Sequence, residues 1–390
     1  MRRSINLIAH LDPKFGGMSS SVPALAAATV LTRRYTALLL AFCDETETDE
    51  YSHVDNLMTL RFPIDHFRPV DDVDMHVRLS PIIRDFDVIH IHGIWRSHCA
   101  AAGRLAVRYR KPFIASAHGM LDDWALRNKH WKKAIYSATI ERPNLQHAAC
   151  LRALTRVEVD NYRSFGLRNP VALIPNGVTP PQEFSAQRFL ERHPELEGRR
   201  LVLFLSRIHY KKGTDLLCRA WASVAAQFPD AHLVFAGPDF EGTLQNTRHA
   251  VHQLKLQDRV TFAGMLSGPD KWAALAAATV FVLPSWSEGF SVATLEAMAA
   301  SRPVIITHQC NFPEIAVQEC GWLIQPDVWQ LETALGEALS MPQSRLDRLG
   351  ENGKNLVAAR YSWEQIGVQM TEVYDWVLGG PRPAHVEVFE

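Results

Sequence analysis

The chain has 390 residues, enough for two or three domains that each bury a core of their own. Hydrophobic residues make up 47% and charged residues 21%, and the formal net charge of −1 lacks the basic excess typical of nucleic-acid-binding proteins. Six scattered cysteines without a C-x-x-C pair argue against a disulfide scaffold and against a zinc module, and they fit a reducing compartment.

Two features of the apolar segments bear on localisation. The N-terminal sequence MRRSINLIAHLDP contains an apolar run that is too short for the core of a signal peptide. The longest apolar stretch, around residues 272–283, is shorter than the roughly 18 residues that a membrane-spanning helix needs. We therefore expect a cytoplasmic protein, whose contact with a membrane would be peripheral and on the inner face of the cytoplasmic membrane.

Short apolar runs rich in Val, Ile, Leu and Phe alternate with helical patterns along the whole chain. The predicted strands are 4–11, 36–42, 57–62, 87–93, 112–118, 149–155, 170–177, 200–207, 231–237, 260–264, 280–285 and 302–308. Apolar runs without polar alternation are typical of parallel strands that are buried on both faces. The pattern predicts an α/β protein with doubly wound parallel sheets, in which ligands bind beyond the carboxyl ends of the strands.

The alternation pauses once, in a charged segment that follows the prolines at 180–181. We therefore expect an N-terminal Rossmann-like domain over 1–180, a linker over 181–199, a C-terminal Rossmann-like domain over 200–378 and a tail over 379–390. Apolar residues at helical spacing predict a last helix over 361–378. That helix packs either on its own domain or back on the N-terminal domain.

The segment 280–305 is the most informative part of the chain. Its buried strand ends at Pro284-Ser285, a short loop carries Glu288 and Gly289, and a helix is expected to begin near Ser291. The N–H groups at the start of a helix have no partner within the helix, and they lie at the positive end of its dipole. The N–H groups of Phe290, Ser291 and Val292 therefore predict a phosphate site, which Gly289 would let a ligand approach closely.

Two carboxylates accompany this predicted phosphate site. Glu288 lies in the loop, and Glu296 lies inside the helix, eight positions later. Carboxylates are poor ligands for phosphate, but they accept hydrogen bonds from sugar hydroxyls. This placement favours a ligand that carries sugar hydroxyls on either side of a diphosphate.

The sequence PSWSEGFSVATLEAMAASRPVI, with its two glutamates, resembles the signature of retaining nucleotide-sugar glycosyltransferases of family 4, the glycosyl transferases of group 1. The resemblance extends over nearly the whole chain. It implies the GT-B fold, in which two Rossmann-like domains face each other across a cleft, with the acceptor on the N-terminal side and the donor on the C-terminal side. It also implies retention of the anomeric configuration, without an essential metal and without a cofactor.

Other motifs match the same family. In SRIHYKKG (206–213) the resemblance assigns Arg207 and Lys212 to the donor diphosphate, and the neighbouring Lys211 is the alternative to Lys212. A guanidinium and an ammonium group at the end of a strand are suited to neutralise a departing nucleoside diphosphate. The family's roles for the two carboxylates would make Glu288 hold the hydroxyls of the sugar and Glu296 the ribose.

The glycine-rich loops match as well. Gly16-Gly17, after the first strand, resembles the loop whose backbone approaches the donor phosphates in this family. The segments AGP (236–238) and FAGML (262–266), the latter with Met265, resemble the loops that line the pocket for the nucleotide base.

A histidine ends one of the predicted strands. His118 matches a family position that faces the donor sugar, and this chain has Gly119 where many relatives have Asp. His90 and His92 alternate on another strand, so their side chains share one face. No third ligand follows at a metal-binding distance, so we expect no metal site, and we expect His92 to face the cleft.

A local excess of basic charge is the last feature of interest. Residues 101–168 contain 13 Lys and Arg against 5 Asp and Glu, a net charge of +8. Within 121–136, aromatic and basic side chains are interleaved: Trp124, Trp131, Tyr136, Arg127, Lys129, Lys132 and Lys133. This pattern fits a solvated helix face, or a patch for anionic headgroups or for the lipid diphosphate of an acceptor. No RNA-binding module is recognisable, and we expect no nucleic-acid partner.

The sequence thus predicts a retaining glycosyltransferase. It would move a sugar from a nucleotide-diphosphate donor, UDP- or GDP-linked, to a hydroxyl of a saccharide acceptor, expected to be linked to a lipid, in the synthesis of cell-surface polysaccharide, exopolysaccharide or lipopolysaccharide. A GT-B-like epimerase or phosphorylase is a rival enzyme. A non-catalytic nucleotide-sugar-binding protein on the same fold is the alternative from another class. The absence of a G-x-G-x-x-G motif after the first strand argues against a dinucleotide dehydrogenase.

Overall fold

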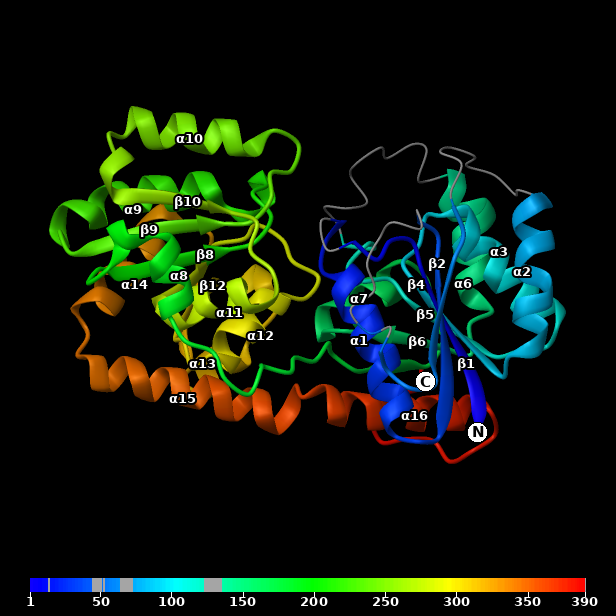
Figure 1. Cartoon of the computed structure of the whole chain (residues 1–390). Coiled ribbons are helices and arrows are strands. Elements are labelled where there is room, and N and C mark those ends of the chain that lie inside the picture. The colour runs from blue at the N-terminus through cyan, green and yellow to red at the C-terminus, as the bar shows by residue number, and fades with distance from the viewer. Residues whose placement is uncertain (13–14, 44–50, 52, 64–72, 123–134, 390) are drawn as a thin grey trace. The chain divides into compact units, whose positions relative to one another are not determined.

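The computed structural model describes residues 1–389 except 13–14, 44–50, 52, 64–72 and 123–134 (Figure 1). The chain divides into two compact units. The first comprises Met1–Gly177 together with Trp363–Glu390, and the second comprises Val178–Ser362. Each unit is an α/β structure built on one mainly parallel sheet, as the sequence predicts.

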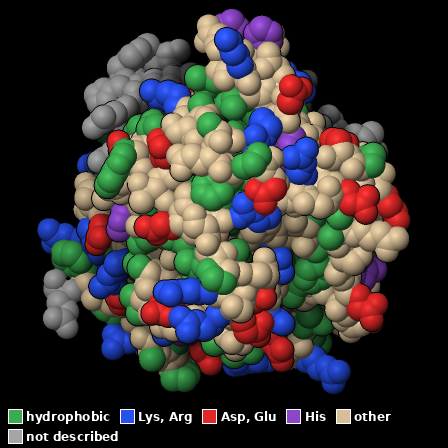
Figure 2. All heavy atoms as spheres, turned by 90° about the vertical axis from the view of Figure 1, so that its left-hand side faces the viewer, with side chains coloured by type: hydrophobic (Ala, Val, Ile, Leu, Met, Phe, Trp, Pro, Cys, Tyr) green, Lys and Arg blue, Asp and Glu red, His purple; other side chains and the backbone are tan. Residues whose placement is uncertain are grey.

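The surface charge and the length of the helices indicate which partners and membrane contacts to expect. On the face shown in Figure 2, Lys and Arg side chains are interspersed with Asp and Glu, in line with the net charge of −1. Among the helices of the described residues, none is long and apolar enough to cross a bilayer.

The sheet of the first unit has eight strands in the order β14-β7-β6-β5-β4-β1-β2-β3, and all pair in parallel except β14. The strands are β1 Arg2–Ile8, β2 Tyr35–Ala41, β3 Leu57–Arg61, β4 Val88–His92, β5 Phe113–Ser116, β6 Cys150–Ala153, β7 Val171–Leu173 and β14 Val386–Glu387. The helices are α1 Met18–Leu31, α2 Val73–Asp85, α3 Ser97–Arg108, α6 Arg142–Gln146, α7 Arg156–Ser164, α16 Trp363–Val377 and a π-helical turn over Ser137–Glu141.

Successive residues of the central strands pack into different clusters, because side chains alternate between the two faces of a sheet. In β2, Leu38 and Leu40 join the cluster that includes Leu79 of α2 and Leu105 of α3. Leu39, between them, joins a separate cluster with α1. Both faces of the sheet are therefore covered by helices, which explains why these strands are apolar without alternation.

The sheet of the second unit has six parallel strands in the order β10-β9-β8-β11-β12-β13. The strands are β8 Arg200–Leu205, β9 Ala231–Ala236, β10 Val260–Gly264, β11 Ala278–Leu283, β12 Val304–Thr307 and β13 Gly321–Ile324. The helices are α8 Gln187–Arg192, α9 Thr214–Gln227, α10 Thr243–Gln253, α11 Gly268–Ala277, α12 Val292–Ala299, α13 Glu314–Val317, α14 Val328–Ser340 and α15 Gln343–Arg360, with 3-10 turns at Pro194–Leu196, Tyr210–Lys212, Gln257–Arg259 and His308–Cys310.

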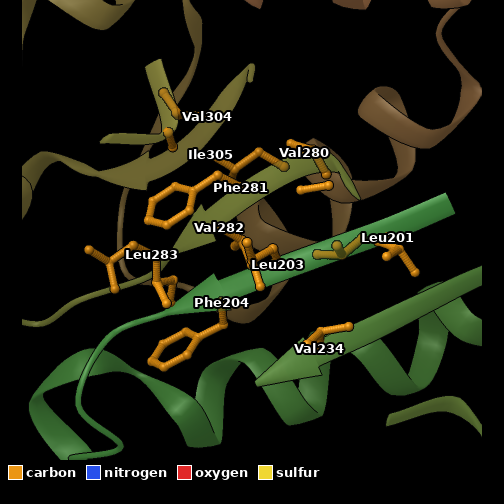
Figure 3. Packing of buried hydrophobic residues seen from close by; sticks show 14 of the residues in the cluster. Leu201, Leu203, Phe204, Val234, Val280, Phe281, Val282, Leu283, Val304 and Ile305 are labelled. Atoms are coloured by element: carbon orange, nitrogen blue, oxygen red, sulfur yellow. The ribbon is translucent and has the colours of Figure 1, made fainter. Parts of the chain in front are cut away.

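The core of the second unit forms around β8 and β11. Phe204 of β8 and Phe281 of β11 are fully buried among aliphatic side chains of the neighbouring strands (Figure 3). Burying such a side chain contributes about 1.5–3 kcal/mol relative to leaving it exposed. This packing holds the carboxyl ends of β8 and β11 side by side, since the two strands are direct neighbours.

The expected linker over 181–199 is not a separate segment. Phe189 of α8 and Leu196 are buried in the core of the second unit. Arg192 also forms an ion pair of 2.6 Å with Asp270 of α11. The second unit therefore begins at Val178 and not at 200, because this charged stretch carries enough apolar side chains to pack.

The expected end of the C-terminal domain at 378 also differs from the structure. Helix α16 belongs to the first unit, where Ile366 and Met370 pack with Leu25 of α1. Gly367 makes this approach possible, because a Cβ there would collide with the carbonyl oxygen of Ala28. Of the two placements left open for the last helix, the structure has the one on the N-terminal part. The tail contributes β14, which pairs antiparallel with β7.

Candidate functional site

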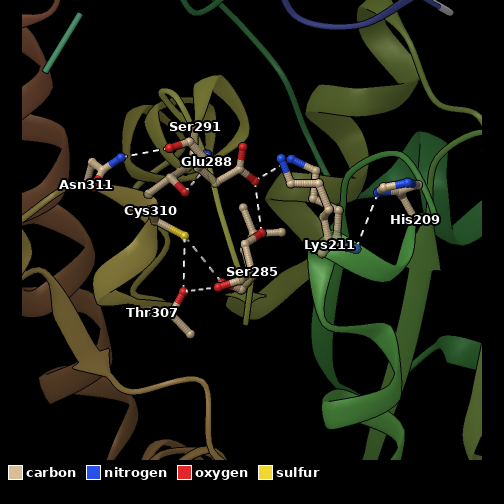
Figure 4. Close-up of polar contacts among 11 residues, drawn as sticks. His209, Lys211, Ser285, Glu288, Ser291, Thr307, Cys310 and Asn311 are labelled. Carbon is tan, nitrogen blue, oxygen red and sulfur yellow. Dashed lines mark hydrogen bonds and ion pairs between the residues drawn. The ribbon is translucent and has the colours of Figure 1, made fainter. Parts of the chain in front are cut away.

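Glu288 is held in place by contacts from three sides (Figure 4). Its carboxylate forms an ion pair with the ammonium group of Lys212 and accepts a hydrogen bond of 2.9 Å from the hydroxyl of Ser285. Its backbone N–H donates to the carbonyl of Gln309 at 3.0 Å, and its carbonyl accepts from the side-chain amide of Asn311 at 2.7 Å. The loop between β11 and α12 thus presents this carboxylate in a fixed position.

Lys212 comes from the loop between β8 and α9. Its side chain is 13% exposed and that of Glu288 is 9% exposed, so their ion pair is largely shielded from solvent. Gly213 follows in the left-handed conformation (φ 70°), and a Cβ there would collide with the carbonyl oxygen of Pro284. The N–H of Trp286 donates to the carbonyl of Lys211 at 2.7 Å. The two loops are therefore joined by backbone contact, and of the two lysines it is Lys212 that reaches Glu288.

Arg207 lies at the end of β8 and is half-buried. Its guanidinium group stacks over the ring of Phe240, 4.6 Å from the centroid. Burial lowers the pKa of Arg207, and the negative charge of Glu288 acts in the opposite direction. Among the described residues, the structure shows no hydrogen bond or ion pair of this guanidinium. Its N–H donors are therefore available to an anion.

Helix α12 begins as the sequence predicts. Ser291 is the N-cap, and its hydroxyl accepts a hydrogen bond of 3.3 Å from the N–H of Thr294. The first backbone bond of the helix runs from Leu295 N–H to the Ser291 carbonyl. The N–H groups of Val292 and Ala293 therefore have no partner within the helix, and the positive end of the helix dipole lies there.

The two residues before the N-cap play different parts. The ring of Phe290 is partly buried and packs against Phe312, with centroids 4.8 Å apart. The φ of Gly289 is not positive, so the turn does not need glycine for its backbone conformation.

Glu296 has a partner of its own. Its carboxylate lies 2.5 Å from the ammonium group of Lys271 on α11. Each of the two glutamates thus pairs with a different lysine. Sequence reasoning did not single out Lys271, because its contact with Glu296 depends on how α11 packs beside α12.

The loops expected to line a base pocket follow neighbouring strands. Met265 lies directly after β10 and is 47% exposed. Gly237 follows β9 with a φ of 142°, and a Cβ there would collide with the carbonyl oxygen of Ser206. Gly237 donates a hydrogen bond of 2.7 Å to the carbonyl of Gly264, which links the two loops.

In the first unit, the Gly16-Gly17 pair leads into α1. Gly16 has a φ of 117°, which glycine adopts without strain, and Gly17 is the N-cap of the helix. The N–H of Ser21 donates to the carbonyl of Gly17 at 2.9 Å. The pair therefore forms a turn at the start of α1, in the loop that follows β1.

His118 follows β5 in the left-handed conformation, with a φ of 53°. Such backbone strain is uncommon outside glycine and clusters at functional sites. Its Nε2 lies 3.1 Å from Nδ1 of His92. Burial, reinforced by the charge of Arg152, lowers the pKa of His118 to about 3, so the imidazole is neutral at physiological pH.

Two residues that sequence reasoning missed hold the turn at His118. The carboxylate of Glu158 on α7 accepts hydrogen bonds of 2.7 Å from the N–H groups of Gly119 and Leu154. The hydroxyl of Tyr162, also on α7, accepts from the N–H of Ala117 at 3.0 Å. The pattern T-R-V-E (155–158) resembles a capping box, but its glutamate binds a distant turn. The sequence carries no signal for that contact.

His90 and His92 are buried on β4, where their ring nitrogens contact other side chains. His90 contacts Tyr374 and Ser116, and His92 contacts Asn6 and His118. In the part of the chain that the structure describes, no group of three or more His, Cys, Asp or Glu side chains could hold a metal ion. Most of the basic and aromatic stretch over 121–136 lies outside the described residues.

The chain matches two family descriptions that together span both units. "Glycosyl transferase 4-like domain" matches residues 16–177, and "Glycosyl transferases group 1" matches residues 186–356. The chain belongs to the group 1 glycosyl transferases. It is therefore a glycosyltransferase with the GT-B fold, as the resemblance of its motifs implies.

Individual relatives agree with this assignment. The GDP-mannose-dependent alpha-(1-6)-phosphatidylinositol monomannoside mannosyltransferase of Mycolicibacterium smegmatis is 25% identical over 387 residues, which is 95% of this chain and 97% of that protein. A human subunit of phosphatidylinositol N-acetylglucosaminyltransferase is 29% identical over 208 residues, which is 53% of this chain and 41% of that protein. The solved structure of Anabaena HepE in complex with UDP has the same fold, with a TM-score of 0.74, 17% identity and coverage of 96% of this chain and 100% of that one.

Proposed function

We propose that this glycosyltransferase moves a sugar from a nucleoside diphosphate donor to a hydroxyl of a lipid-linked saccharide acceptor, with retention of the anomeric configuration. The setting would be the synthesis of cell-surface polysaccharide, exopolysaccharide or lipopolysaccharide. In this reaction the bond between the anomeric carbon and the phosphate oxygen breaks on the face where the acceptor oxygen then bonds. The leaving phosphate accepts the proton of the acceptor hydroxyl.

The observation that carries the proposal is the group of anion-binding donors that follow the carboxyl ends of β8 and β11. Arg207 has no hydrogen-bond partner among the described residues, Lys212 pairs with Glu288, and α12 presents the N–H groups of Val292 and Ala293, which have no partner within the helix. Charge builds up on the diphosphate as it leaves, and fixed donors stabilise that charge without having to reorganise. We propose that these groups bind the diphosphate, so that no metal is needed.

In this proposal the two carboxylates and the histidine bind the hydroxyl groups of the substrates. Glu288 would accept hydrogen bonds from hydroxyls of the transferred sugar, and Glu296 from the ribose, each in exchange for part of its contact with lysine. His118 would hold the transferred sugar or the acceptor. Gly16, Gly17, Gly289, Phe290, Ser291 and Met265 would contribute backbone or apolar contacts to the donor.

The identity of donor and acceptor follows from relatives by analogy. The mycobacterial relative is named for GDP-mannose and for a phosphatidylinositol monomannoside, and HepE is solved with UDP. We propose a GDP- or UDP-linked sugar as the donor, with GDP-mannose as the first to test, and an acceptor whose saccharide is attached to a lipid.

We also propose that the enzyme reaches this acceptor by docking on an anionic membrane face. The support is the net charge of +8 over 101–168 and the interleaved Trp, Tyr, Arg and Lys side chains of 121–136. Indole and phenol rings favour the headgroup level of a membrane, and basic side chains favour its phosphates. This would make the enzyme a peripheral protein of the cytoplasmic membrane.

A thermal-shift screen against UDP-, GDP-, ADP- and dTDP-linked sugars tests the donor assignment. A ligand that binds only the folded state at about 100 times its Kd stabilises the protein by about 2.7 kcal/mol. We expect a concentration-dependent rise in Tm with one nucleotide series, and release of sugar from the preferred donor on long incubation. A non-catalytic binding protein would show the rise in Tm without any release, and a protein that responds to none of the donors would contradict the proposal.

A further inference from the structure

A chain of hydrogen bonds runs through the buried core of the first unit and ends at His118. Its members come from three strands, the turn after β5 and the last helix: Asn6, His90, His92, Ser116, His118 and Tyr374. Polar side chains in a core need partners, because an unpaired buried donor or acceptor costs free energy. The position of the Asn6 amide oxygen sets the direction of each bond in this chain.

Asn6 sets the direction of two of these bonds. Its side-chain oxygen lies 3.2 Å from Nε2 of His92 and 3.4 Å from the hydroxyl of Tyr374. An amide oxygen only accepts hydrogen bonds, so both partners must donate. His92 therefore carries its proton on Nε2, and Tyr374 points its hydroxyl proton toward Asn6.

The protonation state of His92 determines the direction of its hydrogen bond with His118. Burial keeps its pKa well below the usual value, helped by the positive charge of Arg152, so the ring is neutral. A neutral imidazole with a proton on Nε2 has a bare Nδ1. The bond of 3.1 Å between this Nδ1 and Nε2 of His118 therefore needs the proton of His118.

The other branch agrees with this assignment. Tyr374 gives its proton to Asn6, so it accepts from Nδ1 of His90 at 2.9 Å. Nε2 of His90 is then bare and accepts from the hydroxyl of Ser116 at 2.8 Å. Every bond in the chain has one donor and one acceptor.

We propose that Asn6 and His92 are positioning residues that hold His118 in the tautomer with a proton on Nε2, which leaves Nδ1 as a hydrogen-bond acceptor for a substrate hydroxyl. The contact with a substrate hydroxyl rests on the proposed function, whereas the tautomer of His118 is independent of it. The structure shows no partner for Nδ1 of His118 among the described residues. Because a bare nitrogen only accepts, the substrate group that it contacts must be one that donates.

The tautomer can be measured directly on the full-length protein labelled with ¹⁵N-histidine. Long-range ¹H–¹⁵N correlation spectra distinguish a protonated from a bare ring nitrogen, and the His118 signals are identified by their loss in His118→Gln. We expect a protonated Nε2 and a bare Nδ1 from pH 6 to pH 8. The opposite tautomer, which would follow if the amide of Asn6 were turned round, would overturn the proposal even if the enzyme transfers sugar normally.

Two variants of His92 test the positioning role. His92→Asn keeps an acceptor near the place of Nδ1, so it should keep the tautomer of His118 and most of kcat/KM. His92→Phe removes the acceptor, so it should give a mixture of tautomers and lower kcat/KM about tenfold, the size expected for one lost hydrogen bond. His90→Phe is the matched control, because His90 is equally buried on the same strand but forms no hydrogen bond with His118.

The outcomes separate this inference from the proposed function. A preserved His118 tautomer in His92→Phe, or an equal loss of kcat/KM in His90→Phe, would contradict the positioning role while leaving the transferase in place. If no donor is turned over but the spectra show the expected tautomer in the parent and the mixture in His92→Phe, the positioning role stands and the proposed function fails.

Discussion

Arg207 and Lys212 are the residues on which the proposed chemistry depends most. Because they would stabilise charge that develops on the leaving diphosphate, replacing either by Ala should lower kcat by about 10²–10³. The fold should survive, since Arg207 has no polar partner among the described residues and Lys212 lies in the turn Tyr210–Lys212, outside the hydrophobic core. Steady-state kinetics with the preferred donor measures the effect. Lys211→Ala is the matched control, and near-normal turnover in both Arg207→Ala and Lys212→Ala would contradict the assignment.

The two glutamates should differ in what they bind. Glu296→Ala should weaken binding of the free nucleoside diphosphate, because the ribose would lose hydrogen bonds. Glu288→Ala should leave that binding nearly unchanged and impair use of the sugar. Isothermal titration with the nucleoside diphosphate separates the two variants. If both bind it as the parent does, the ribose role of Glu296 is wrong.

Sequence patterns singled out charged residues of the second unit but not the contacts that hold His118 in the first unit. Arg207, Lys212 and Glu288 belong to local motifs, and the structure brings Lys212 and Glu288 into contact. Glu158, by contrast, contacts a turn 39 positions away, and Asn6 on β1 contacts His92 on the neighbouring strand β4. Such contacts depend on tertiary packing, so no local pattern predicts them.

At the scale of elements, the contact between α1 and α16 depends on one glycine. Gly367→Ala would force the two helices apart, because the added Cβ collides with the carbonyl oxygen of Ala28. We expect a loss of about 1–3 kcal/mol in the free energy of unfolding, as for other overpacked sites. Urea denaturation measures it.

Gly336 in α14 provides the contrast for that measurement. A Cβ at this position meets nothing within 4 Å, so Gly336→Ala should raise the free energy of unfolding by about 0.5–1 kcal/mol through helix propensity. If Gly367→Ala behaved like Gly336→Ala, the close packing of α1 on α16 would be contradicted.

Most strands were predictable, because parallel strands buried on both faces are continuous apolar runs. Each predicted run overlaps a strand, from β1 to β12. The strands that were missed are β13, a four-residue segment with the sequence Gly-Trp-Leu-Ile, and β14, which has two residues. Neither is a continuous run of Val, Ile, Leu and Phe, because β13 begins with Gly and Trp and β14 has only two residues. Their pairing with a neighbouring strand decides their conformation.

At the scale of the whole molecule, the division into units was predicted less well than the elements. The prolines at 180–181 and the charge that follows suggested a linker, yet Phe189 and Leu196 join the core of the second unit. The last helix returns to the first unit, and the apolar face of α16 carries no information about which sheet it covers. Composition therefore indicates roughly where a boundary between two units lies, but not at which residue.

Membrane docking is a property of the whole molecule that vesicle co-sedimentation can test. Each basic side chain near an anionic surface contributes about 1 kcal/mol, and salt screens the attraction. We expect recovery with anionic vesicles at low salt that falls at high salt and in Lys132→Glu/Lys133→Glu. The control, Lys255→Glu/Arg345→Glu, makes the same change of charge at exposed positions of the second unit. Equal recovery with neutral and anionic vesicles would remove the membrane proposal and leave the transferase assignment intact.

The central claim is that protein groups, rather than a metal ion, meet the charge of the diphosphate while the sugar is transferred with its configuration retained. The most direct test is NMR of the anomeric configuration of the product formed from the preferred α-linked donor in the presence of EDTA. We predict an α-linked product, formed at a rate that EDTA does not change. A β-linked product, or activity that disappears in EDTA and returns with Mg²⁺ or Mn²⁺, would contradict the account.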